Sequence, residues 1–206
     1  MENKAVKSPS STSMIKPRSK SPAVRTQLDP DRWVDAAIDA LAKEGMAGLR
    51  VELIAKRCGV TKGSFYWHFK DRQALLDAIL TRWKEGRIRD IEKTTSVQAG
   101  MERDQLQYAI EVYGASRNRK GMSIELAVRD WARHDANAAK IVEEVDLYRL
   151  ECTRRLFIAC GMSDAEAKSR SLLLYACVFG LSLMHYKHFD NDLDALKQRI
   201  TERIVS

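Results

Sequence analysis

The chain has 206 residues, a formal net charge of +7, and a composition that is 45% hydrophobic and 31% charged, as is ordinary for a soluble protein with a packed core. The longest nearly continuous apolar run, residues 172–184, is shorter than the roughly 20 residues that a membrane span needs, and the N-terminus has no apolar segment of the signal-peptide kind. The sequence contains ten Gly and four Pro and shows little alternation of Val, Ile and Thr, which predicts an all-helical fold. Because no span or export signal is recognised and the cysteines fit reduced thiols, we expect a cytoplasmic protein without a membrane partner. Its length suits one domain, or a small domain followed by a larger one.

Residues 1–27 are predicted to form a disordered basic tail. This segment contains six Lys or Arg and one Glu, so it carries most of the net charge, and it is rich in Ser and Pro. Such a composition cannot bury enough apolar surface to fold. Two interpretations stay open: a solvated leader, or an arm that adds contacts to phosphates.

Residues 28–87 are predicted to form a small domain of short helices. Asp29 and Pro30 are typical of the start of a helix, and the first helix should end at Gly45. A second helix is expected over 50–58, followed by Gly59 in the left-handed position that favours Gly after a helix. A third helix is expected over 61–69, capped by Thr61, and a fourth after residue 71. Two short helices joined by the tight turn at 58–60 are typical of a helix-turn-helix.

The third of these helices contains VTKGSFYWHF, in which five ring-bearing residues follow one another. Phe65 and Phe69 are four residues apart and share one helical face, so we expect both in the core. The side chains of residues 66–68 must then point outward, where their polar tips suit phosphate and sugar. Lys62 suits guanine O6 and N7, and Gly63 weakens the first turn by about 1 kcal/mol relative to Ala. A turn that is poor in helix-forming residues and gains no core contact suggests a binding site.

Residues 30–85 resemble the DNA-binding domain of the TetR family of bacterial transcriptional regulators. The residues that carry the resemblance are Ala37, Gly45, Ile54, Ala55, Gly59, Val60, Gly63, Tyr66, His68, Phe69, Leu75 and Leu76. The resemblance implies that the third helix enters the major groove, with base-edge contacts from residues 62–64 and phosphate contacts from residues 66–68 and from Arg72. Arg50 and Val51 stand where the second helix of the family often opens with Thr or Ser, which suggests a different operator. The candidate DNA-binding residues are Arg50, Thr61, Lys62, Gly63, Ser64, Tyr66, Trp67, His68, Lys70 and Arg72.

Residues 88–206 are predicted to form a larger domain of helices near 102–118, 121–134, 136–160, 163–187 and 192–204. Ser163 and Glu166 form a capping box at the start of the fourth of these. The resemblance implies that this domain binds a small-molecule effector and forms a homodimer. The apolar run 172–184 supports a dimer independently, because a helix that is apolar all round must be covered on every side. We expect the dimer to form through helices near 163–187 and 192–204; the alternative is that one large monomer core covers both.

No cofactor or metal site is expected. The four cysteines have neither C-x-x-C spacing nor zinc spacing and are interpreted as core thiols. Candidate effector-pocket residues are aromatic or Met side chains of this domain, although such residues more often belong to a core than to a pocket. They are Tyr108, Met122, Trp131, Tyr148, Phe157, Tyr175 and Phe179.

Three functions remain in competition. The first is a ligand-responsive, sequence-specific DNA-binding regulator, a repressor by resemblance, which binds a near-palindromic operator as a dimer. The alternative is an architectural DNA-binding protein that uses the basic tail without sequence choice. The third is an enzyme, for which no phosphate loop, nucleophile elbow or metalloprotease motif is present; we therefore expect no catalytic residues.

Overall fold

The computed structural model describes residues 28–96, 100–114 and 119–205, and the predicted tail, 1–27, lies outside these ranges. The described residues form nine α-helices and one short 3₁₀ helix, which confirms the predicted all-helical fold. None of these helices is both long enough and apolar enough to cross a bilayer.

The first half of the chain begins with α1 (Pro30–Glu44), the 3₁₀ helix η1 (Gly45–Gly48), α2 (Val51–Arg57) and α3 (Lys62–Phe65). Asp29 caps α1 by accepting a hydrogen bond from the backbone N–H of Arg32 at 2.8 Å. Gly45 ends α1 with φ +62°, and Gly59 follows α2 with φ +67°. Both φ values are positive, as was predicted for Gly59; for Gly45 the sequence predicted only that the helix ends there.

The third helix is shorter than predicted. It ends at Phe65 instead of Phe69, and the backbone continues as turns. The N–H groups of His68 and Phe69 both donate to the carbonyl oxygen of Phe65, at 2.9 and 3.0 Å. This tightening stacks the rings of Phe65 and Phe69, with centroids 5.2 Å apart. Thr61 occupies the N-cap position, but its side chain accepts no capping hydrogen bond.

The remaining helices are longer. They are α4 (Arg72–Thr95), α5 (Glu102–Gly114), α6 (Arg119–Ala132), α7 (Ala136–Ala159), α8 (Asp164–Leu183) and α9 (Leu193–Val205). Asp71 caps α4, and Ser163 caps α8 by accepting from the N–H of Glu166 at 3.3 Å. The fourth predicted helix of the larger domain is four residues too long, because the backbone turns extended at Met184.

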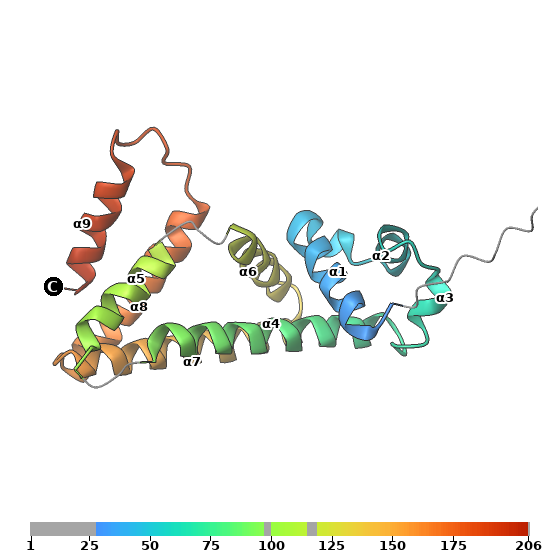
Figure 1. The fold of residues 1–206 in the computed structure, drawn as a ribbon, viewed down its shortest axis with the longest axis horizontal. Helices are drawn as coiled ribbons and strands as arrows, with labels where there is room; N and C mark the ends of the chain where they lie inside the picture. The colour runs from blue at the N-terminus through green and yellow to red at the C-terminus, as the bar shows by residue number, and fades with distance from the viewer. Residues whose placement is uncertain (1–27, 97–99, 115–118, 206) are drawn as a thin grey trace, which may run out of the picture.

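The molecule is elongated, and α4 and α7 form its long axis (Figure 1). The helices α1, α2 and α3 lie at the end of the molecule where α4 begins. The helices α5, α8 and α9 form a separate group at the opposite end. A first core joins α1–α4 to α6 and the first part of α7, and a second joins α5, the end of α7, α8 and α9. The boundary expected at residue 87 falls inside α4, so one continuous helix links the two predicted domains.

Charged side chains are buried where α6 and α7 meet. Glu125 and Arg149 are only 3% and 5% exposed. Arg149 donates to Glu125 at 3.2 and 3.3 Å, and Arg129 donates to Asp146 through two hydrogen bonds of 2.8 and 2.6 Å and to Glu125 at 2.8 Å. The Arg129 guanidinium lies 4.1 Å from the ring centroid of Phe179, which brings α8 into the same cluster.

Candidate nucleic-acid interface and effector cavity

The helix-turn-helix is held by aromatic packing beneath its surface. Phe65 is fully buried and Phe69 is 7% exposed, as predicted. The Phe65 ring meets the edge of Trp33 on α1 at a centroid distance of 5.4 Å. Because these rings anchor α3 from below, the residues between them are held at the surface.

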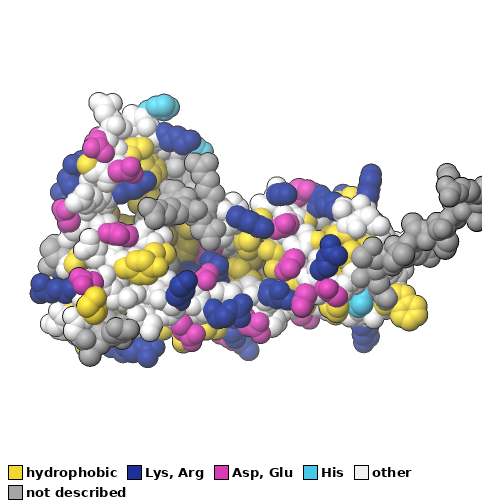
Figure 2. All heavy atoms as spheres, in the orientation of Figure 1, with side chains coloured by type: hydrophobic (Ala, Val, Ile, Leu, Met, Phe, Trp, Pro, Cys, Tyr) yellow, Lys and Arg dark blue, Asp and Glu magenta, His cyan; other side chains and the backbone are white. Residues whose placement is uncertain are grey.

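Tyr66 and Trp67 lie outward, with exposed fractions of 56% and 80%. His68 is half-buried, and its Nε2 has no hydrogen-bond partner among the described residues. Hydrophobic side chains are visible at the surface where α3 lies (Figure 2). A Trp left this exposed gains almost nothing from folding, so its position favours a contact made outside the chain.

The other candidate DNA-binding residues lie on the same element or beside it. Lys62, Gly63 and Lys70 are exposed, and Ser64 is half-buried. Ser64 Oγ donates to the carbonyl oxygen of Thr61 at 2.8 Å, which stabilises the first turn of α3. A Cβ added at Gly63 would meet only Thr61 Oγ1, at 3.7 Å, so the surface over this turn is open.

Two of the candidates also hold the fold. Arg72 Nε donates to the carbonyl oxygen of Leu49 at 3.0 Å, which ties the start of α4 to the segment before α2. Arg50 precedes α2, and its carbonyl oxygen accepts from the N–H groups of Leu53 and Ile54. The Arg50 side chain is exposed.

Sequence reasoning missed an ion pair on this surface. Glu52 of α2 lies 2.5 Å from Lys62 Nζ of α3. Hydrogen bonding to Lys62 lowers the pKa of the Glu52 carboxyl, and the same contact raises the pKa of Lys62. A count of charges over residues 50–72 finds six Lys or Arg and two acids, but it does not show which base Glu52 meets.

The effector-pocket candidates do not share one cavity. Trp131, Phe157 and Tyr175 are buried in the helical body, and the Tyr175 hydroxyl lies 3.0 Å from that of Thr153. Met122 is half-buried against the second core, Phe179 lies beneath Arg129, and Tyr108 is 46% exposed. Of the seven, Tyr148 lines a cavity between α4 and α7.

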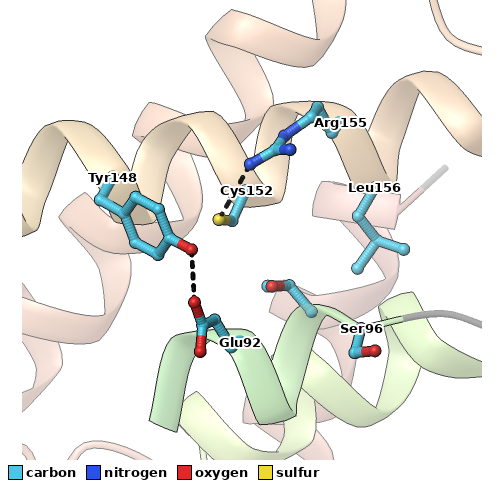
Figure 3. Close-up of a pocket in the computed structure, with 7 residues that line it drawn as sticks. Glu92, Ser96, Tyr148, Cys152, Arg155 and Leu156 are labelled. Carbon is cyan, nitrogen blue, oxygen red and sulfur yellow. Dashed lines mark hydrogen bonds between the residues drawn. The ribbon is translucent and has the colours of Figure 1, made fainter. Parts of the chain in front are cut away.

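That cavity, of about 300 Å³, lies between α4 and α7 (Figure 3). Tyr148 points across the gap and donates to Glu92 Oε1 at 2.8 Å, while Arg155 Nη2 lies 3.4 Å from Cys152 Sγ. The hydrogen bond to the Glu92 carboxylate raises the pKa of Tyr148 to about 12, because it favours the neutral phenol. The lining residues are Glu92, Thr95, Ser96, Tyr148, Cys152, Arg155 and Leu156.

A second hollow, of about 340 Å³, lies between α6 and α7 and includes Arg129 and Asp146 of the buried charge cluster. In the part of the chain that the structure covers, no group of three or more His, Cys, Asp or Glu side chains could hold a metal ion. The four cysteines are free thiols.

Comparison with known proteins agrees with the helix-turn-helix. Residues 34–79 match the family described as "Bacterial regulatory proteins, tetR family". The class A tetracycline repressor protein from transposon 1721 of Escherichia coli is 43% identical over 54 residues, which are 26% of this chain and 25% of that protein. The regulator SrpR of Pseudomonas putida is 33% identical over 58 residues, 28% of this chain and 27% of its own. The chain thus spans about a quarter of the length of these curated relatives.

Solved structures extend the similarity of the fold to both parts of the molecule. A transcriptional regulator from Saccharomonospora viridis, solved in complex with choline, superposes with a TM-score of 0.70 at 16% identity over 85% of this chain and 94% of its own. FadR from Bacillus subtilis, solved with stearoyl-CoA, gives 0.63 at 18% identity over 86% and 98%. Residues 34–79 are therefore similar to the helix-turn-helix of TetR-family regulators, and the fold of the described residues is that of these solved regulators.

Proposed function

We propose that this protein is a ligand-responsive repressor that binds a near-palindromic DNA operator as a homodimer in the cytoplasm. The observation that carries the proposal is the surface of α3, where exposed Lys62, Tyr66 and Trp67 stand on a buried Phe65–Phe69 anchor. Side chains fixed in this way present donors to a groove at little cost in conformational entropy, because the backbone beneath them is already ordered.

In this proposal α3 enters the major groove, Lys62 contacts base edges, and Tyr66, Trp67, Lys70 and Arg72 contact phosphates. The small first turn of α3 allows the close approach that base contacts need. Base contacts give sequence preference, and phosphate contacts fix the orientation on the duplex.

The dimer is supported by the surface of α8. Leu172, Leu173, Leu183 and Met184 are large apolar side chains, each at least 49% exposed. A Cβ added at Gly180 would meet nothing within 4 Å, so a second helix could approach closely there. An exposed apolar face on α8 favours a second copy of the chain as its partner.

The cavity between α4 and α7 is the proposed effector site. Its lining combines a carboxylate, a guanidinium and hydroxyl groups with the less polar side chains of Cys152 and Leu156. Ligand sites commonly combine polar and apolar groups in this way. Choline and stearoyl-CoA in the two solved regulators have different chemistry, so the shared fold does not specify the effector of this chain.

Selection of bound duplexes from a random DNA pool tests the proposal. The full chain and a version that lacks residues 1–27 should both enrich one near-palindromic site. Binding without enrichment that disappears together with the tail would instead support the architectural alternative, because counterion release alone gives affinity without sequence preference.

Two variants separate the proposed contacts. Lys62→Ala should relax base preference at one position per half-site and cost about 1–3 kcal/mol in affinity for the selected site. Lys70→Ala should weaken all sequences alike and reduce the salt dependence of binding. Equal effects of the two variants on all sequences would contradict the assigned roles.

A further inference from the structure

The ion pair between Glu52 and Lys62 joins the two helices of the helix-turn-helix across its turn. The two side chains are 59% and 50% exposed, and Lys62 Nζ lies 2.5 Å from Glu52 Oε1. An exposed pair of this kind contributes about 0–1 kcal/mol to stability. Stability is therefore a weak reason for an acid at this place.

Glu52 is one of few acids in a basic part of the sequence. Residues 50–72 contain two acids, and Asp71 is used as the cap of α4, where it accepts from the N–H of Ala74 at 2.9 Å. Glu52 and Asp71 are both exposed, but Glu52 is the acid that pairs with a base of the surface proposed to meet a polyanion. Phosphates repel a carboxylate, so Glu52 lowers the affinity of this surface for the DNA backbone.

Base edges include hydrogen-bond donors that a carboxylate can accept from, whereas phosphates are acceptors only. In the major groove a G·C pair presents guanine N7 and O6 as acceptors, next to the N4 amino group of cytosine as a donor. O6 and N4 are partners in the base pair, so they lie a hydrogen-bond length apart. An ammonium and a carboxylate 2.5 Å apart match this spacing.

We propose that Glu52 and Lys62 together read one G·C base pair, with Lys62 donating to guanine O6 and N7 and Glu52 accepting from cytosine N4. This inference rests on the proposed function, because it requires α3 in the major groove. Glu52 is thereby a specificity-determining residue on α2, and it also positions Lys62 before DNA is bound.

The same pair of charges discriminates against the other base pairs. With T·A, Lys62 would meet O4 beside the thymine methyl group, and Glu52 would meet the adenine amino group beside the acceptor N7, which repels a carboxylate. With G·C, Lys62 meets two acceptors and Glu52 meets a donor with no acceptor beyond it. Inverting G·C places each charge opposite a group of the wrong kind.

The test compares the full-length protein with its Glu52→Gln and Glu52→Ala variants in selection from a random pool, followed by equilibrium binding to the selected duplex. Glu44→Gln is the matched control, because Glu44 is another exposed acid of the same domain that pairs with an arginine, Arg57. Wild type and Glu44→Gln should require G·C at one position per half-site, whereas Glu52→Ala should lose the requirement for cytosine there, with roughly tenfold weaker discrimination.

A chemical probe isolates the cytosine contact. N4-methylcytosine at that position retains base pairing but replaces the N–H that faces the groove. It should weaken binding of the wild type roughly tenfold and leave Glu52→Ala unaffected.

The inference is overturned if Glu52→Ala keeps the preference of the wild type and only binds all duplexes more tightly, as Glu44→Gln would. If the wild type enriches no sequence, the proposed function fails as well. The two failures are thus distinguishable by the wild-type selection alone.

Discussion

The buried charge cluster allows a prediction about how the helical body is held together. Glu125 is the carboxylate that α6 contributes, and it accepts from both Arg129 and Arg149. Glu125→Leu would leave Arg149, which is 5% exposed, without this partner. Breaking a buried pair commonly costs 3–5 kcal/mol. Because Asp146 still contacts both arginines, we expect the lower end, a loss of about 3 kcal/mol in the free energy of unfolding.

The double variant Glu125→Leu, Arg149→Met separates pairing from packing. Replacing both partners by apolar groups of similar size is often neutral or stabilising. Two buried atoms of the pair, Glu125 Oε2 and Arg149 Nε, have no hydrogen-bond partner in the described residues, so the double variant breaks no hydrogen bond at these two atoms. We expect the double variant within about 1 kcal/mol of wild type. Arg129 should stay in place through its two hydrogen bonds to Asp146.

Urea denaturation followed by circular dichroism measures these differences, at one protein concentration because a dimer makes stability depend on concentration. Glu143→Ala, an exposed acid of α7, is the control and should stay within about 0.5 kcal/mol of wild type. A loss of less than about 1 kcal/mol for Glu125→Leu would refute the reasoning. So would a double variant that costs as much as Glu125→Leu and Arg149→Met, each measured alone, added together.

Three further predictions concern the turn at Gly59, the proposed dimer and the cavity between α4 and α7. Gly59→Ala should cost about 1–2 kcal/mol by its left-handed backbone alone, since φ is +67° and an added Cβ would meet nothing within 4 Å; a much larger loss in urea denaturation would contradict this. Leu172→Glu should convert a dimer to a folded monomer in sedimentation velocity, and an unchanged dimer would exclude α8 as the interface. Tyr148 should ionise near pH 12 in an absorbance titration of wild type against Tyr148→Phe. Because the pKa in the folded state exceeds the usual value of about 10, this contact contributes stability below pH 10 that is lost as the pH rises towards 12. Glu92→Gln should return the midpoint towards 10.

The helix-turn-helix could be predicted because its signals are local. Asp29 and Asp71 cap the following helices, Gly59 adopts the positive φ that a helix end requires, and the spacing of Phe65 and Phe69 places both rings in the core. Each depends on residues within one turn of the chain. The length of α3 was not predictable in the same way, because its end depends on how Phe65 and Phe69 stack against Trp33 of α1.

The cavity between α4 and α7 could not be predicted, because it depends on pairing between distant helices. Glu92 and Tyr148 are 56 residues apart and meet only when α4 packs on α7. The aromatic residues proposed from the sequence as pocket residues are of the same types that pack in a hydrophobic core. Trp131 and Phe157 are buried in the core of the helical body. The pair of Glu52 and Lys62 was missed for a related reason, since the turn at Gly59 sets which of six bases meets the acid.

Each candidate site includes a residue of α4, Arg72 at the DNA-binding surface and Glu92 at the cavity, and this favours a mechanical link between the two sites. With 24 residues, α4 is about 36 Å long. Arg72 at its start donates to Leu49 beside α2, Lys84 lies 2.5 Å from Glu144 of α7, and Glu92 near its end accepts from Tyr148 at the cavity. A tilt of about 5° imposed at the cavity would move the other end by about 3 Å over this length. In a dimer that reads two grooves one helical turn apart, opposite displacements of both α3 elements would lose the register with the half-sites. An effector that fits only the tilted arrangement would therefore release DNA by shifting the population towards it, without touching the DNA-binding surface.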